Sequence, residues 1–496
     1  MKAIETDVLV TGAGAAGLTL GIELARRGVA FRLIDQAPAP FEGSRGKGIQ
    51  PRTLEVFEDM GVVDRILAAG GPYPPQREHR DGTFKDTALT EYRAPTPAEP
   101  YGNPTMLPQF LTERVLRDRL AELGHRVEFG RALTGFRQDK DGVTATVAGE
   151  TVRARYLIGC DGGRSFVRHA LGIDFPGKTL GIRAVVADMR LEGLSDDAWH
   201  RWNDGTPEQI SLCPLRGTEL FQLQAPIPLE GDIDLSAKGL GAMIAKRTGR
   251  KDLVVRAVTW ASAYNMNARL ADRYAQGRVY LAGDAAHIHP PTGGQGLNTS
   301  VQDAYNLGWK LAAVLAGAPL SLLASYEAER RPVAAEVLGL STKLLDALKQ
   351  RGDLRRGRET QQLDLFYPDS PLSLPYTFDL RGPKPAILPG DRAPDAPCRG
   401  VGGQPTRLFS LFGGPHWTLL GYETDPALAA RAGLRIHRTG RRGDLIDDGG
   451  HIRAAYGLTP GLWVLVRPDG YVSAVVPAAG LAALETFLKS VGLGAP

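Results

Sequence analysis

Cysteine is scarce in this sequence. Only three occur among 496 residues, Cys160, Cys213 and Cys398, and no two of them form a Cys-x-x-Cys pair. So few and so widely spaced cysteines exclude a disulfide-stapled secreted fold and a cysteine zinc site. They also exclude a dithiol reductase, because that chemistry needs two neighbouring thiols.

Long apolar runs and a strong net charge are also missing. No stretch approaches the roughly 20 apolar residues of a membrane span, and residues 1–10 carry acids and lead directly into a strand pattern, so we expect neither membrane binding nor a signal peptide. The formal charge of +4 comes from 59 basic and 55 acidic residues spread along the chain, which argues against nucleic acid as a partner. The length predicts two or three domains, and the cytoplasm is the expected location.

What the chain does contain is glycine directly after buried strands. Residues 7–10 predict a short strand, followed by the motif Gly12-x-Gly14-x-x-Gly17, a helix, and a second strand that ends at Asp35. This order, with the acid about 20 residues beyond the glycines, is the dinucleotide-binding pattern. The glycines let a pyrophosphate approach the helix start, and the acid can bind ribose hydroxyls. A structural tight turn is the simpler alternative.

Two later strands end in the same kind of loop. A predicted strand over 151–158 precedes Cys160-Asp161-Gly162, and another over 278–282 precedes Gly283-Asp284. Asp161 is compatible with a role near a helix N-terminus or with a ligand contact, and both remain open. The loop after Asp284 leads into a long helix, whose first amides would stabilise an anionic ring such as a reduced flavin.

A basic loop follows the first motif. Residues 44–52 hold two arginines and a lysine among glycines, which suits an anion-binding loop near the pyrophosphate. A solvated basic loop is the slightly simpler interpretation from these residues alone.

Composition and periodicity divide the chain into several regions. Residues 1–178 and 266–350 predict one α/β domain, with 71–108 as an excursion toward a second domain over 179–265, where strand patterns alternate with turns and a helix near 240–248. Residues 351–389 predict a linker and 390–496 a small α/β domain, with a strand over 406–412. We expect Pro332 to break or kink the helical region 320–348. No second dinucleotide motif appears in the insertion, so no stably bound nicotinamide cofactor is indicated.

Taken together, the motifs at Gly12, Asp35, Arg45, Asp161 and Asp284 resemble, in order and spacing, a known family. It is that of the FAD-dependent aromatic hydroxylases, single-component flavoprotein monooxygenases of the para-hydroxybenzoate and phenol hydroxylase type, most nearly those acting on polyketide-like aromatics. The resemblance covers essentially the whole chain. It implies a Rossmann-like FAD-binding domain, an inserted antiparallel-sheet substrate domain, and a C-terminal thioredoxin-like domain that lacks Cys-x-x-Cys and suits packing or homodimer contacts.

The resemblance also implies roles for single residues. Asp35 would bind the adenosine ribose and Asp284 the ribityl hydroxyls, while Arg45 and Asp161 would also meet NADPH or NADH, the transient electron donor. The residues implied to contact FAD are Gly12, Gly14, Ala15, Ala16, Gly17, Asp35, Gln36, Arg45, Gln109, Ala132, Asp161, Gly162, Gly283, Asp284, Pro291, Gly293, Gly294, Gln295, Gly296, Leu297 and Asn298.

The implied reaction is hydroxylation of an aromatic substrate, phenolic or polycyclic, by molecular oxygen. The nicotinamide donor reduces the flavin, and oxygen forms a C4a-hydroperoxide that attacks the ring. The candidates for lining the substrate pocket are Leu212, Phe221, Leu223, Trp260 and Pro291, each equally compatible with core, and Gln222 and Gln224, which share one strand face. No catalytic base is identified. His287 and His289 are more simply structural.

Other functions on the same scaffold remain open. One is Baeyer-Villiger oxygen insertion into a ketone, and another is a flavin-dependent oxidase, dehydrogenase or reductase. A non-enzymatic flavin-binding protein fits less well, because the loops are complete. A flavin halogenase is disfavoured, because the inserted domain has no Trp-x-Trp motif.

Overall fold

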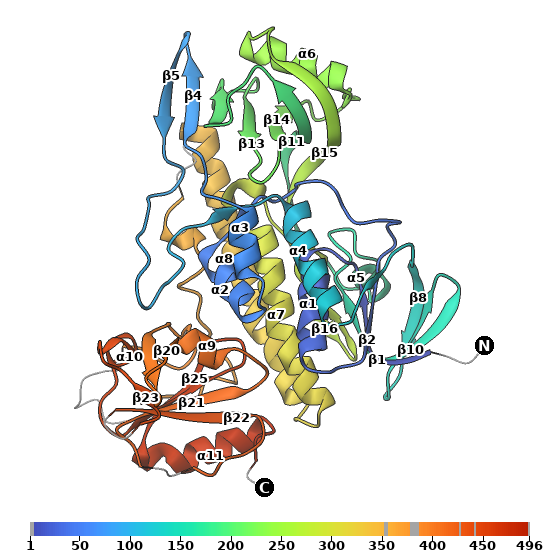
Figure 1. Ribbon diagram of the computed structural model, residues 1–496. Helices are drawn as coiled ribbons and strands as arrows, with labels where there is room; N and C mark the ends of the chain where they lie inside the picture. Colours follow the sequence, from blue (N-terminus) through green and yellow to red (C-terminus); the bar gives the residue numbers. More distant parts are fainter. Residues whose placement is uncertain (1–3, 352–355, 377–385, 426–427, 441–442, 495–496) are drawn as a thin grey trace.

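Three sheets organise the molecule (Figure 1). The computed structural model describes residues 4–351, 356–376, 386–425, 428–440 and 443–494. Within these residues no helix has the length and apolarity needed to cross a membrane. The central α/β layer lies between the inserted sheet and the C-terminal domain, which are at opposite ends of the molecule in this view.

The first sheet carries the dinucleotide motif. Its central strands are parallel, and Val8, Leu9 and Val10 are completely buried, as expected of a parallel sheet covered on both faces. Its main path, in order across the sheet, is β16 (Ala275–Gln276), β17 (Val279–Leu281), β10 (Glu150–Gly159), β1 (Ile4–Thr11), β2 (Phe31–Ile34) and β7 (Val127–Glu128), and the antiparallel pair β8 (Leu133–Gln138) and β9 (Val143–Val147) joins it at β10.

The register of this sheet brings three motifs to one edge. Thr11 at the end of β1 lies beside Gly159 at the end of β10, and Gly159 lies beside Leu281 at the end of β17. Because parallel strands end at the same edge, the loops that begin at residues 12, 160 and 282 meet above the sheet.

Long helices pack around this sheet. α7 lies against α1, where Gly308 allows close approach: a Cβ there would be 2.6 Å from the Cβ of Glu23. Pro332 was predicted to break or kink the second long helix. It does not break it, because α8 continues through Pro332, flanked by buried Arg330, Val333 and Ala334, and a kink stays a prediction. The helices are α1 (Ala15–Arg26), α2 (Pro51–Asp59), α3 (Val63–Ala69), α4 (Gln109–Glu122), α5 (Phe166–Ala170), α7 (Gly296–Leu315) and α8 (Ser321–Arg351).

The second sheet belongs largely to the insertion. Helix α6 (Ala237–Thr248) covers one of its faces, and a hairpin from residues 76–87 extends its edge. The strands, in order across the sheet, are β18 (His287–Ile288), β15 (Val254–Leu270), β11 (Gly177–Glu192), β14 (Phe221–Ile227), β13 (Ile210–Pro214), β12 (Trp199–Trp202), β4 (Gln76–Arg80) and β5 (Thr83–Thr87).

The C-terminal domain is built on a third sheet. The strand predicted over 406–412 is wrong, because only β20 (Pro405–Arg407) is extended and α9 (Leu408–Phe412) follows. The Asp395 carboxylate accepts a hydrogen bond from the Phe409 amide at 2.9 Å, which caps this short helix. The other elements are β19 (Pro397–Gly400), β21 (Trp417–Tyr422), β22 (Leu434–Thr439), β23 (Leu445–Ile446), β24 (Leu462–Val466), β25 (Val472–Pro477), α10 (His451–Tyr456) and α11 (Leu481–Ser490).

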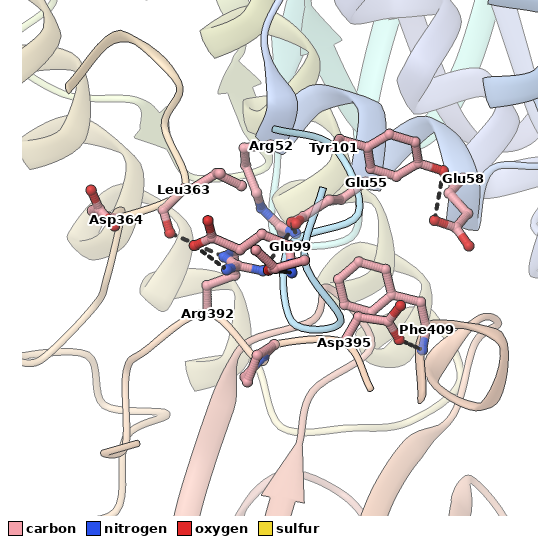
Figure 2. A network of polar contacts seen from close by, with 12 residues as sticks. Arg52, Glu55, Glu58, Glu99, Tyr101, Leu363, Asp364, Arg392, Asp395 and Phe409 are labelled. Carbon is pink, nitrogen blue, oxygen red and sulfur yellow. Dashed lines mark hydrogen bonds and ion pairs between the residues drawn. The ribbon is translucent and has the colours of Figure 1, made fainter. Parts of the chain in front are cut away.

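A polar network joins this domain to the central layer (Figure 2). Glu55 on α2 accepts from Arg52 at 2.8 Å and from Arg392 at 2.9 Å. Of the predicted linker 351–389, residues 352–355 and 377–385 lie outside the described residues. The described part of this segment packs against the central layer: the amide of Arg52 on α2 donates to the carbonyl of Gln361 at 3.2 Å.

Candidate functional site

The glycine loop after β1 is pressed against the loop after β10. A Cβ on Gly12 would lie 2.2 Å from the Cys160 carbonyl oxygen, and the backbone φ of Gly12 is +97°. A Cβ on Gly17 would lie 1.9 Å from the Gly12 carbonyl oxygen. Only glycine fits either position, so neither residue places a side chain at the start of α1.

Asp35 holds this loop from β2. Its Oδ2 accepts from the Ala13 amide at 2.7 Å and its Oδ1 from the Ala37 amide at 2.8 Å. The carboxylate is half-buried, and its neighbour Gln36 is exposed. The structure thus shows Asp35 bracing the glycine loop, and its contact with a ribose remains a prediction.

Asp161 serves two purposes at once. Its Oδ2 accepts from the Val167 amide at 3.1 Å, near the start of α5. Its Oδ1 is buried and has no hydrogen-bond partner in the described part of the chain. A Cβ on neighbouring Gly162 would meet no atom within 4 Å, so open space lies beside it. One oxygen is structural, and the other is free for a ligand.

Asp284 lies in the third loop, at the same sheet edge. It is exposed, although Gly283 and Ala285 on either side are buried. The protein packed around the loop still raises the pKa of its carboxyl by desolvation, and His287 and Arg45 oppose that rise. Such a carboxylate suits ligand hydroxyls better than a further anion.

Beneath Asp284 lies a fully buried charge cluster. Asp303 on α7 accepts from His287 Nε2 at 2.6 Å, from Arg330 Nε at 2.8 Å and from the Gly283 amide at 3.2 Å. The three side chains are 0% exposed. These contacts agree with a structural role for His287, which stays a prediction. Its neighbour His289 stays neutral, because desolvation lowers its pKa to about 3.

The loop between residues 291 and 298 is braced by its own side chains. Asn298 accepts from the Gln50 amide at 2.8 Å and donates to the carbonyls of Gly48 at 2.9 Å and Gly294 at 2.8 Å. Gln295 donates to Gly293 and to Thr360. Both side chains are buried and brace the loop from inside, and a Cβ on Gly296 would meet no atom of the described residues within 4 Å. Leu297 packs against the loop of Gly46, and Pro291 is exposed.

Gln109 and the basic loop meet at the start of α4. The Gly46 amide donates to Gln109 Oε1 at 3.3 Å, and Gln109 Nε2 donates to Glu113 Oε1 at 2.8 Å. The Arg45 guanidinium lies 5.1 Å from the centre of the Phe41 ring. Ala132 lies apart from this group, in the β8–β9 hairpin, where its carbonyl accepts from the Ala148 amide.

The inserted sheet has one apolar and one polar face. Leu212, Phe221 and Leu223, expected to line a substrate pocket, are packed instead into the core under α6. Trp260, Asp188, Gln222 and Cys213 stand in cross-strand register on the opposite face. This face adjoins the basic loop, because a Cβ on Gly43 would be 2.3 Å from the Trp260 ring.

Lys47 connects the basic loop to that polar face. Its Nζ donates to Gln222 Oε1 at 2.7 Å and lies 4.1 Å from the centre of the Trp199 ring. Burial lowers the pKa of this amine and raises that of nearby Asp188. The sequence predicted Lys47 only as one charge of an anion-binding loop, and it carries no local signal for Asp188. The same is true of Asp303 and Arg330.

Comparisons with known proteins agree with this geometry. A family model described as FAD binding domain matches residues 5–341, and one described as aromatic-ring hydroxylase, C-terminal, matches residues 386–496. The chain is 41% identical over 499 residues to a flavin-dependent monooxygenase of Mycobacteroides abscessus, with 98% of this chain and 100% of the relative covered.

Two further matches name aromatic substrates. The chain is 34% identical over 522 residues to 12-dehydrotetracycline 5-monooxygenase/anhydrotetracycline 6-monooxygenase of Streptomyces rimosus, with 98% of each chain covered. Its fold matches that of aklavinone-11 hydroxylase, solved in a ternary complex with FAD and aklavinone, with a TM-score of 0.85, 28% identity and 99% of both chains covered.

Proposed function

The chain belongs to the FAD-dependent aromatic-ring hydroxylases, and from this membership we propose that it hydroxylates a polycyclic, phenolic aromatic of the polyketide kind. It is a flavin-dependent monooxygenase and thus an oxidoreductase acting on aromatic compounds. NADPH or NADH would be the electron donor and molecular oxygen the co-substrate. The polycyclic substrate is supported by the anhydrotetracycline and aklavinone enzymes that the chain resembles.

The meeting of three loops at one sheet edge carries this proposal. FAD fits the residues found there: Gly12 and Gly17 leave the start of α1 open for a pyrophosphate, one oxygen of Asp161 is buried without a partner among the described residues, and Asp284 offers an exposed carboxylate to hydroxyls. Asp35 would face the ribose beyond the glycine loop. When bound and reduced, FAD supplies the oxygen-activating chemistry.

The chain's own residues would orient the ring and keep water away. The first amides of α7, at the positive end of its dipole, would stabilise negative charge on the cofactor ring. We assign the substrate side of the inserted sheet to the face that carries Asp188, Gln222 and Gln224, because it adjoins the basic loop. Gln224 Nε2 donates to Gln222 Oε1 at 2.7 Å, so these amides form a linked polar wall.

The test is oxygen transfer to a panel of polycyclic phenols that includes anhydrotetracycline and aklavinone. With a substrate, NADPH or NADH oxidation should rise above background, and mass spectrometry should find one labelled oxygen from ¹⁸O₂ on a ring carbon. Insertion of the label beside a ketone would identify Baeyer-Villiger chemistry. Hydrogen peroxide formed in full yield with every aromatic would identify an oxidase and refute the proposal.

A further inference from the structure

A carboxyl group lies where the cofactor pyrophosphate is expected. Glu113 is on α4, one helical turn after Gln109, and is only 1% exposed. Its Oε1 lies 3.7 Å from the point where a side chain on Gly14 would begin, directly at the start of α1. The packing of α4 on α1 thus places an acid beside the amides that suit a phosphate.

No close ion pair neutralises this acid in the described part of the chain. Arg117 Nη1 is 4.0 Å from Glu113 Oε2, too far for a hydrogen bond, so this cation offsets the carboxylate charge only in part. The other groups that face the carboxyl are the side chain of Gln109, the amide of Ala15 and, more weakly, the guanidinium of Arg45. Together these groups stabilise the ionised form of Glu113, but burial destabilises that form by more.

The protonation of Glu113 therefore changes within the physiological range. Desolvation is the largest influence and raises the pKa of its carboxyl to about 7. A pyrophosphate at the start of α1 would bring negative charge beside the same group. An ionised Glu113 would repel it and compete for the Ala15 amide, whereas a protonated Glu113 could donate a hydrogen bond.

We propose that Glu113 is a positioning residue that makes FAD retention depend on pH, with the neutral acid accompanying the bound pyrophosphate and its ionisation promoting release. The proposal rests on FAD binding by this family and not on the identity of the aromatic substrate. Its failure would leave the hydroxylase function untouched, and the two are tested by separate measurements.

The sign and size of the effect follow from proton linkage. FAD binding would raise the pKa of the Glu113 carboxyl further. The affinity for FAD is therefore highest below the pKa of the free protein, and it falls as the pH rises above that value. If bound Glu113 stays protonated throughout, the dissociation constant rises by up to about 25-fold between roughly pH 6.5 and 8.5.

The experiment measures FAD binding to the full-length, FAD-stripped protein by quenching of flavin fluorescence, from about pH 6 to 9. Glu113→Gln, which resembles the neutral acid, should bind FAD with little pH dependence and more tightly than wild type at high pH. The matched control is Glu122→Gln on the same helix, an exposed acid paired with Arg65 and Arg119, which should follow the wild-type curve. Equal slopes for wild type and Glu113→Gln, or a flat wild-type curve, would overturn the proposal.

A second measurement needs no variant. Calorimetric titration of wild-type protein with FAD, repeated in buffers of different ionisation enthalpy, counts the protons bound. Uptake of nearly one proton per FAD is expected at about pH 8, and little uptake at about pH 6. Absence of uptake at the higher pH would refute the proposal even if Glu113→Gln failed to fold.

Discussion

Replacing Asp303 by asparagine should loosen the loop that carries Asp284. The change removes the negative charge that faces Arg330 Nε at 2.8 Å and His287 Nε2 at 2.6 Å, in a cluster where all three side chains are 0% exposed. Breaking a buried ion pair from one side costs about 3–5 kcal/mol, because the remaining charge stays in the interior. For a domain of this size, that corresponds to a fall in Tm of roughly 6–20 °C.

Thermal unfolding, followed by circular dichroism and by release of flavin fluorescence, measures the effect. The double variant Asp303→Asn/Arg330→Met should lose less than the sum of the single variants, by roughly 0.5–3 kcal/mol, because no unpaired charge is left. The matched control is Asp444→Asn, which weakens a His437–Asp444 pair at 2.7 Å with side chains 20% and 37% exposed, and should cost at most about 1 kcal/mol.

Acid titration gives the same cluster an independent test. His287 and Arg330 hold the pKa of the Asp303 carboxyl below its ordinary value despite burial. A lowered folded-state pKa stabilises the protein fully above the unfolded-state value of about 3.9, and this contribution is lost as pH falls below it. Asp303→Asn should flatten that acid limb. Equal losses in Asp303→Asn and Asp444→Asn, or strictly additive single variants, would refute the reasoning.

Three further changes probe other parts of the molecule. Gly12→Ala should give folded protein without visible flavin absorbance, because the added Cβ would lie 2.2 Å from the Cys160 carbonyl oxygen at a φ of +97°. Arg467→Met removes two hydrogen bonds to buried Glu329 and two to buried Asp469, and should cost about 3–5 kcal/mol and speed proteolytic release of the C-terminal domain. Gln224→Leu should raise the KM for the aromatic substrate about tenfold while leaving the Kd for FAD unchanged, because its amide belongs to the polar wall and bonds to Gln222 instead of the basic loop. The first expectation fails if the flavin content is normal, the second if the rate of proteolysis is unchanged, and the third if the affinity for FAD shifts.

Local chemistry made part of this site visible in the sequence. The strand before Gly12, the glycines at fixed spacing and the acid at Asp35 all act within about 30 residues of one another, so periodicity and turn chemistry suffice to predict them. The acids at Asp161 and Asp284 could be expected at one edge for a similar reason, since each directly follows a strand of a parallel sheet. Strand alternation also predicts that Gln222 and Gln224 share one face of the sheet, but it does not predict what that face packs against.

Contacts across long stretches of chain decided the rest. Alternation along a strand separates two faces, but only packing of α6 assigned Leu223 to the core and Gln222 to the basic loop. Asp303 pairs with Arg330 on another helix, and the first turn of α9 is braced by Asp395, which precedes it by 13 residues. In the sequence, Glu113 looks like any surface glutamate of a helix. It is buried only because α4 packs on α1 in the folded protein. Burial and charge pairing depend on residues that are distant in the sequence and close in the fold, so the residues next to a side chain in the sequence do not predict them.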